Sequence, residues 1–260
     1  MKRVLAIGGS DSGGGAGIQA DIKTLHGMGV HVSAVITAVT SQDTAAVHDV
    51  HPLSAAVITR QLRAVLDDIG ADVVKTGMLA TAEAVHVVAQ NLGGRPLVVD
   101  PVGISSTGHS LLTPEGLVAL KSELLPLATV VTPNLAEVEA LTGIVVTTAA
   151  DLERAAEAVH ALGPQWVLIT GGHLDGPPLD LLYDGKRAIP MEGPRIDTAH
   201  THGSGCTLAS ALAGYLAMGH DVPDAARRAK QLTAQAIRDG YALGSGNGPV
   251  RPPGGDSVGA

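Results

Sequence analysis

Short runs of β-branched residues alternate with longer stretches rich in Ala, Leu and Glu along most of the chain. Each run closes on Gly, Asp, Thr or Asn, and this alternation is typical of a parallel sheet with helices on both faces. The expected strands are Val4–Gly8, Val32–Thr37, Val73–Thr76, Leu97–Asp100, Thr129–Thr132 and Trp166–Thr170. The pattern predicts an α/β fold in which ligands bind beyond the carboxyl ends of these strands.

The later part of the chain predicts a small antiparallel edge and a disordered tail. Leu179–Tyr183 and Lys186–Pro190 flank Asp184-Gly185, a strong hairpin signal. Residues 251–260 are rich in Gly and Pro and are expected to be disordered. Because the chain has 260 residues, is 45% apolar and shows no internal repeat, we expect one domain over residues 1–250.

Composition excludes several classes of partner. The net charge of −8 argues against nucleic-acid binding, and no stretch approaches the roughly 20 apolar residues of a membrane span. A single cysteine allows no internal disulfide, and no apolar signal core follows Met-Lys-Arg, so we expect a cytoplasmic protein. The eleven histidines lack metal-ligand spacing, and His200-x-His202 is more typical of a polar loop than of a zinc pair.

The segment Thr201-His-Gly-Ser-Gly-Cys-Thr207 stands directly before a long apolar helical run. Gly203 and Gly205 allow successive N–H groups to converge on one point, and the helix adds its positive dipole end. The same position favours the thiolate form of Cys206. An ordinary glycine-rich loop before a buried helix explains the composition equally well, so this segment alone leaves phosphate binding open.

A second glycine-rich segment runs from Gly8 to Asp21, between an expected strand and an expected helix. It does not fit a dinucleotide-binding turn, because the spacing is poor and no acidic residue closes the next strand. We interpret it as a close-fitting wall around a small ligand, with Asp21 as a hydrogen-bond acceptor. A solvated helix residue is the alternative for Asp21.

Seven blocks stand out, in order from about Val4 to Val250: the segment Gly8–Asp21, Thr40-Ser-Gln-Asp-Thr44, Lys75-Thr-Gly-Met-Leu79, Val99-Asp-Pro-Val102, Thr132-Pro-Asn-Leu-Ala-Glu137, Thr170-Gly-Gly-His173 and Thr201–Thr207. Together they closely resemble the hydroxymethylpyrimidine/phosphomethylpyrimidine kinases of thiamine biosynthesis, members of the ribokinase-like superfamily. The resemblance implies a three-layer sandwich whose central sheet is mostly parallel, with helices on both faces and a small antiparallel edge.

The implied activity is ATP-dependent phosphorylation of 4-amino-5-hydroxymethyl-2-methylpyrimidine to the monophosphate and then to the diphosphate, in one site. The family holds the pyrimidine with residues that match Gly9, Asp21, Gln42, Met78 and Val102. Asp21 and the Gln42 amide would pair with the amine and ring nitrogens, while the other side chains supply apolar contact. Without the resemblance, core filling would explain Met78 and a surface loop would explain Gln42.

The resemblance also assigns the phosphoryl-transfer machinery. Gly203, Ser204, Gly205 and Cys206 would cradle the phosphoryl group with N–H groups. Asn134 and Glu137 would organise Mg²⁺ and its waters around the nucleotide phosphates, and Asp100 would add charge at the metal. The expected nucleotide-binding residues are Asn134, Glu137, Thr170, Gly171, Gly172 and Thr207. Helix N-capping is a second interpretation of Asn134 that is compatible with the first.

Most ribokinase-like enzymes carry a general-base Asp where this chain has Cys206. The thiol could act as base for the first phosphorylation, which is the interpretation that we favour, or contribute only its N–H. The second phosphorylation attacks from an anionic phosphate and needs no base.

Two departures from the family pattern concern phosphate binding. Thr170 replaces a lysine that contacts nucleotide phosphate, and the loop 103–108 lacks a Met and a basic residue often found there. These changes put phosphate affinity and the second phosphorylation in question, and Lys75 and Lys230 are the candidate replacements. The segments Val35–Val50 and Ile104–Leu111 are the expected lids.

Two other functions stay open from the sequence. A pyridoxal or pyridoxine kinase is the alternative within the superfamily, and a non-catalytic pyrimidine sensor is the alternative from another class. A sensor would not need Asn134, Glu137 and the 203–206 turn. The resemblance further implies a homodimer.

Overall fold

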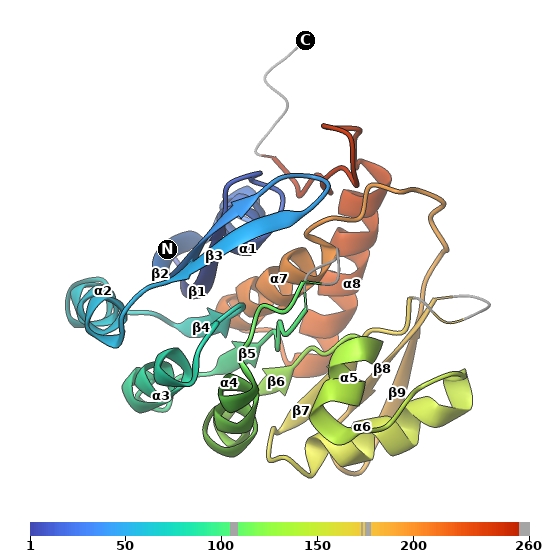
Figure 1. Cartoon of the computed structure of the whole chain (residues 1–260). Coiled ribbons are helices and arrows are strands. Elements are labelled where there is room, and N and C mark those ends of the chain that lie inside the picture. Colours follow the sequence, from blue (N-terminus) through green and yellow to red (C-terminus); the bar gives the residue numbers. More distant parts are fainter. Residues whose placement is uncertain (105–108, 173, 175–177, 255–260) are drawn as a thin grey trace.

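A nine-stranded sheet runs through the centre of the molecule (Figure 1). The computed structural model describes residues 1–104, 109–172, 174 and 178–254, and these form the sheet in the order β3-β2-β1-β4-β5-β6-β7-β8-β9. The strands are β1 (Arg3–Asp11), β2 (His31–Gln42), β3 (Val47–Pro52), β4 (Val73–Thr76), β5 (Leu97–Val99), β6 (Val130–Val131), β7 (Trp166–Ile169), β8 (Leu179–Tyr183) and β9 (Ala188–Glu192). β2, β1, β4, β5, β6 and β7 are parallel, so their carboxyl ends share one edge.

Helices cover both faces of the sheet, which confirms the three-layer α/β architecture (Figure 1). One face packs against α1 (Gly17–Gly27), α7 (Ser204–Met218) and α8 (Val222–Arg238). The other packs against α2 (Ala55–Asp68), α3 (Ala82–Asn91), α4 (Pro114–Ala119), α5 (Leu135–Thr142) and α6 (Leu152–His160). Neighbouring residues of a strand serve opposite faces: Val4 belongs to the α7 side and Leu5 to the α2 side.

All six predicted parallel strands are present, and β8 and β9 form the predicted antiparallel edge. The prediction missed β3, which pairs antiparallel with β2 at the opposite edge. Its polar sequence, Val47-His-Asp-Val-His-Pro52, is mostly exposed and lacks the apolar run of a buried strand. Residues 35–50, expected as a lid loop, therefore lie mostly in the two strands of a hairpin.

Helix α7 is the central element of its layer. Nine of its residues are buried, and most of them are Ala, Gly, Ser or Thr, which lets neighbouring elements approach closely. A Cβ at Gly214 would come within 2.7 Å of Met28 Cε. Small side chains therefore replace the aromatic residues that a core of this size commonly contains.

The segment 251–254 contacts the last turn of α8 and the end of α1, where Pro253 lies against Gly27. The Arg251 N–H donates to the Ala236 carbonyl at 2.9 Å, and its guanidinium lies 4.9 Å from the centre of the Tyr241 ring. Residues 255–260, the rest of the tail predicted to be disordered, lie outside the described residues. Within the described part of the chain, no helix is long and apolar enough to cross a membrane.

Candidate active site

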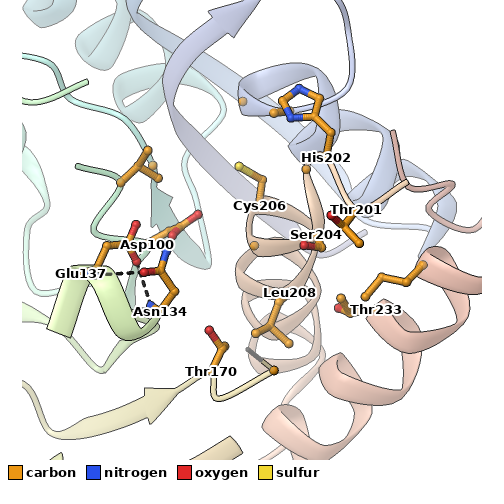
Figure 2. A pocket seen from close by; sticks show the side chains of 18 of the residues that line it. Asp100, Asn134, Glu137, Thr170, Thr201, His202, Ser204, Cys206, Leu208 and Thr233 are labelled. Carbon is orange, nitrogen blue, oxygen red and sulfur yellow. Dashed lines mark hydrogen bonds between the residues drawn. The ribbon is translucent and has the colours of Figure 1, made fainter. Parts of the chain in front are cut away.

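A cavity of about 630 Å³ opens at the carboxyl edge of the parallel strands, between that edge and the start of α7 (Figure 2). It is lined by fourteen of the residues that the sequence assigns to a site: Gly9, Asp21, Gln42, Met78, Asp100, Val102, Asn134, Glu137, Thr170, Gly172, Gly203, Ser204, Gly205 and Cys206. Gly171 and Thr207 do not line it. In Figure 2 the carboxylates near α5 face the first turn of α7 across the cavity.

The two glycine-rich segments interlock at this cavity. Gly203 has a φ of 83°, and a Cβ there would strike the carbonyl oxygen of Gly15. A Cβ at Gly17, where φ is 56°, would likewise strike the carbonyl oxygen of Gly9, within the first segment. Both positions require glycine, because a side chain would displace the backbone that it meets.

The first turn of α7 has the geometry of an anion site. The Ser204 N–H donates to the Thr201 carbonyl at 3.1 Å, and the Thr207 N–H donates to the Gly203 carbonyl at 2.9 Å. The amides of Gly205 and Cys206 lie between them, in the first turn, where a helix supplies no partners of its own. Both residues line the cavity, so their N–H groups and the helix dipole are available to a phosphoryl group.

Asp11 organises the N-terminal glycine loop, a role that the sequence analysis missed. Its carboxylate accepts the N–H groups of Gly13, Gly15 and Ala16 at 2.8 to 3.0 Å, and lies 3.1 Å from His202 Nε2. Burial opposes the charge, but these hydrogen bonds outweigh it and lower the pKa of Asp11. The sequence did contain a signal for this role, because Asp11 stands near the end of an expected strand and just before a run of glycines.

Asp21 is buried rather than solvated. Its Oδ1 accepts hydrogen bonds from Lys75 Nζ at 2.8 Å and from Ser210 Oγ at 2.7 Å. Its Oδ2 is buried and has no hydrogen-bond partner among the described residues, and Asp21 belongs to the residues that line the cavity. Lys75, a candidate for the missing phosphate cation, is instead fully buried in this ion pair, 4.0 Å from Asp100 Oδ2.

The expectation that the start of the helix lowers the pKa of Cys206 is wrong. Burial raises the pKa of its thiol to about 12, and the charges of Asp100 and Asp21 add to that shift. The Lys75 ammonium and a hydrogen bond from the Gly17 N–H oppose it without reversing it. The thiol is therefore protonated at neutral pH, and it donates a hydrogen bond to Asp100.

Asn134 caps α5, as one of its two expected roles requires. Asn134 Oδ1 accepts the Glu137 N–H, and Glu137 Oε2 accepts the Asn134 N–H, each at 2.9 Å (Figure 2). Burial and the charge of Asp100 raise the pKa of Glu137 to about 8, although N–H groups of Asn134 and Gly103 oppose the shift. Burial likewise raises the pKa of Asp100 to about 6, against the charge of Lys75.

These carboxylates fit a divalent cation. Asp100 Oδ2 is buried without a hydrogen-bond partner among the described residues, and the charge of Asp100 disfavours the charge of Glu137. No group of three or more His, Cys, Asp or Glu residues within the described ranges could hold a metal by itself. Two carboxylates completed by nucleotide phosphates and water are the usual arrangement for Mg²⁺.

The strand-end loop after β7 contributes Thr170 and Gly172 to the cavity. The Gly171 N–H donates to Asp180 Oδ1 at 3.0 Å, and its Cα packs against the backbone of Leu179, so Gly171 lies behind the wall. Thr207 is fully buried within α7. These two positions support the loop and the helix from outside the cavity.

Two cations near Thr170 line the cavity. Lys230 of α8 forms an ion pair with Asp180 at 2.7 Å. Arg195, which the sequence analysis did not single out, donates to the carbonyls of Gly172 at 3.3 Å and Leu174 at 2.6 Å. Positive charge therefore reaches this end of the cavity from segments remote in sequence from residue 170.

The opposite end of the cavity is apolar and narrow. A Cβ at Gly9 would lie 2.9 Å from Met78 Sδ. Met78 packs in a cluster with Ala38, Val47, Ala80 and Leu111, flanked by Val50 and Val102. The β2–β3 hairpin thus forms part of the wall, and both ends of the other expected lid, Ile104 and Leu111, line the cavity, while residues 105–108 lie outside the described part.

Comparisons with known proteins agree with this geometry. The family model described as phosphomethylpyrimidine kinase matches residues 11–251. The hydroxymethylpyrimidine/phosphomethylpyrimidine kinase of Streptomyces coelicolor is 53% identical over 249 residues, covering 95% of this chain and 93% of that protein. An ADP complex of Bacillus subtilis pyridoxal kinase is similar with a TM-score of 0.91 and 39% identity, covering 97% of each chain. Phosphomethylpyrimidine kinase from Clostridium difficile is similar with a TM-score of 0.80 and 40% identity, covering 91% of this chain and 100% of that one.

Proposed function

The chain belongs to the phosphomethylpyrimidine kinase family, and we propose that it transfers phosphoryl groups from ATP to 4-amino-5-hydroxymethyl-2-methylpyrimidine and then to the resulting monophosphate. The observation that carries the proposal is the cavity itself. It joins an apolar end, built around Met78, to the N-terminus of α7 and to the carboxylates of Asp100 and Glu137. An alcohol held at the first end would face a phosphoryl group held at the second.

The nucleotide phosphates would lie between the α7 N-terminus and the Asp100–Glu137 pair. Magnesium ion, when bound by these carboxylates, would neutralise phosphate charge. The Gly205 and Cys206 amides would stabilise the transferring group, which has a loose and highly charged transition state. Lys230 and Arg195 would supply the positive charge that Thr170 lacks.

The protonated thiol of Cys206 bears on the first step. With a pKa of about 12, the thiol is a poor base at neutral pH, so we assign Cys206 an N–H donor role. In a loose transition state the attacking hydroxyl keeps its hydrogen until bond formation is well advanced, so no strong base is needed early. The second step starts from an anionic phosphate oxygen and needs no base.

The test is phosphate transfer from Mg·ATP to three acceptors in parallel: the pyrimidine alcohol, its monophosphate and pyridoxal. Turnover of both pyrimidines is the expected result. Pyridoxal is included because the Bacillus subtilis neighbour is named a pyridoxal kinase, and turnover of pyridoxal alone would replace the proposal with that activity. Pyrimidine binding without any turnover would indicate a sensor.

We also propose that the enzyme requires Mg²⁺, acts in the cytoplasm and forms a homodimer. The Asp100–Glu137 pair supports the metal, and cysteine usage supports the location. Family resemblance supports the dimer, which light scattering at several protein concentrations would test.

A further inference from the structure

A chain of polar contacts joins Asp11, His202 and Gln42 at the end of the cavity proposed for the pyrimidine. His202 Nε2 lies 3.1 Å from Asp11 Oδ2 and 3.4 Å from Gln42 Nε2. The second polar atom of the Gln42 amide, Oε1, lies 3.4 Å from Thr40 Oγ1. All four residues line the cavity. The role of these contacts in substrate recognition rests on the proposed function, because it requires the pyrimidine to bind at this end.

The hydrogen between Asp11 and His202 has a defined position. Asp11 is ionised, since it accepts three backbone N–H groups and its pKa lies below the ordinary value despite burial. A carboxylate only accepts, so the hydrogen must lie on Nε2 of His202 whether the ring is neutral or cationic. Nε2 then carries its one hydrogen and no free lone pair, so it cannot accept from the Gln42 amide.

The Thr40 hydroxyl determines which atom of the Gln42 amide can face it. Its hydroxyl donates to the Ser10 carbonyl at 3.0 Å, which leaves Oγ1 to accept from Gln42. A Gln42 oxygen beside His202 can share the Nε2 hydrogen with Asp11, and Thr40 offers a lone pair. The amide satisfies both when its oxygen faces His202 and its nitrogen faces Thr40, whereas the reverse sets hydrogen against hydrogen.

We propose that His202, held by Asp11, is a specificity-determining positioning residue that fixes the orientation of the Gln42 amide. The end of the amide then presents one oxygen lone pair beside one N–H, in a fixed order. An aminopyrimidine has the complementary edge, because its exocyclic amine donates while the adjacent ring nitrogen accepts. Pyridoxal has a single ring nitrogen and no amine beside it, so the fixed amide favours the pyrimidine, and an amide free to turn would discriminate less.

The first test is spectroscopic and needs no substrate. Two-bond proton–nitrogen correlations on the ¹⁵N-labelled protein report which ring nitrogen of each histidine carries hydrogen. The His202 signals are assigned by their loss in His202→Phe. We expect hydrogen on Nε2, and a ring protonated on Nδ1 alone would overturn the proposal.

The second test is the selectivity ratio, kcat/KM for the pyrimidine alcohol divided by kcat/KM for pyridoxal. Loss of one orienting hydrogen bond should lower this ratio about tenfold in His202→Phe, and Asp11→Asn should lower it in the same direction. A general loss of structure would lower both activities and leave the ratio unchanged. An unchanged ratio in folded His202→Phe overturns the proposal.

Asp184→Asn is the matched control. Asp184 also accepts two backbone N–H groups and a side-chain donor, but it follows β8, at the edge of the sheet away from the cavity. The selectivity ratio of Asp184→Asn should equal that of the wild type. A wild type that leaves the pyrimidine unphosphorylated would refute the proposed function, and the protonation state of His202 would then decide the orienting contact separately.

Discussion

Replacement of Cys206 distinguishes the two roles that a thiol in this position can have. With a pKa of about 12, about one thiol in ten thousand is ionised at pH 8. General-base catalysis contributes roughly 10² to 10⁴ in rate, so a base present in that proportion gives little net acceleration. Cys206→Ala keeps the backbone N–H, and we therefore expect kcat for the first phosphorylation to fall by less than about tenfold.

The pH dependence provides an independent check. A raised thiol pKa means that thiolate forms only as the pH approaches 12. If thiolate were the base, kcat would rise about tenfold per pH unit across pH 7–9; with an N–H role it should not show this rise. The assay is single-turnover transfer from Mg·ATP to each acceptor, with Cys206→Ser as a polar control. A drop above about a hundredfold confined to the first step of Cys206→Ala would refute the reasoning.

Three further predictions concern the phosphate contact, the glycine turn before α7 and the metal site. Thr170→Lys should lower the KM for ATP by restoring a phosphate contact, and an unchanged or higher KM in steady-state kinetics would count against that contact. Gly203→Ala should lower both Tm and kcat, because the new methyl group would meet the Gly15 carbonyl. Gly219→Ala, with φ 98° but no atom within 4 Å of its Cβ, should cost about 1 kcal/mol of stability with kcat unchanged, as calorimetry and kinetics can show. Because Asp100 and Glu137 have raised pKa values, the metal-free folded state binds more protons than the unfolded chain between about pH 4 and pH 8, so its stability should fall as pH rises through that range. Mg²⁺ should therefore raise Tm more at pH 8 than at pH 5, and equal increments would contradict the metal site.

The parallel strands and the edge of the sheet that carries the cavity could be predicted because both follow from local pattern and general topology. The buried runs ending at Val99 and Ile169 are apolar along their whole length, so their strands were identified within a residue. β3 carries no such signal, since its residues are mostly exposed and its pairing with β2 completes only the edge of the sheet. Hydrophobic pattern identifies strands that bury side chains and misses those that only complete an edge.

Site chemistry was less predictable wherever it depends on desolvation. The sequence places Cys206 at a helix start, which by itself lowers a thiol pKa. It does not show that Lys75, Asp21 and Asp100 converge beneath that thiol, or that burial reverses the shift. Asp21 was expected to accept from the ligand, which stays a prediction; its partner in the structure, Lys75, lies 54 positions along the chain on β4.

The two glycine-rich segments, which are separate in the sequence, contact each other and form one part of the candidate site. Each predicts a tight turn by itself, but in the structure they meet, because a Cβ at Gly203 would strike the Gly15 carbonyl oxygen and a Cβ at Gly15 would lie 2.5 Å from His202 Cδ2. The Asp11 carboxylate accepts N–H groups of the first segment and contacts the second segment through His202. The proposed pyrimidine pocket and the proposed phosphate cradle share these contacts, so a displacement of one segment should displace the other. His202 joins the two, since its Nε2 lies 3.1 Å from Asp11 Oδ2 and 3.4 Å from Gln42 Nε2.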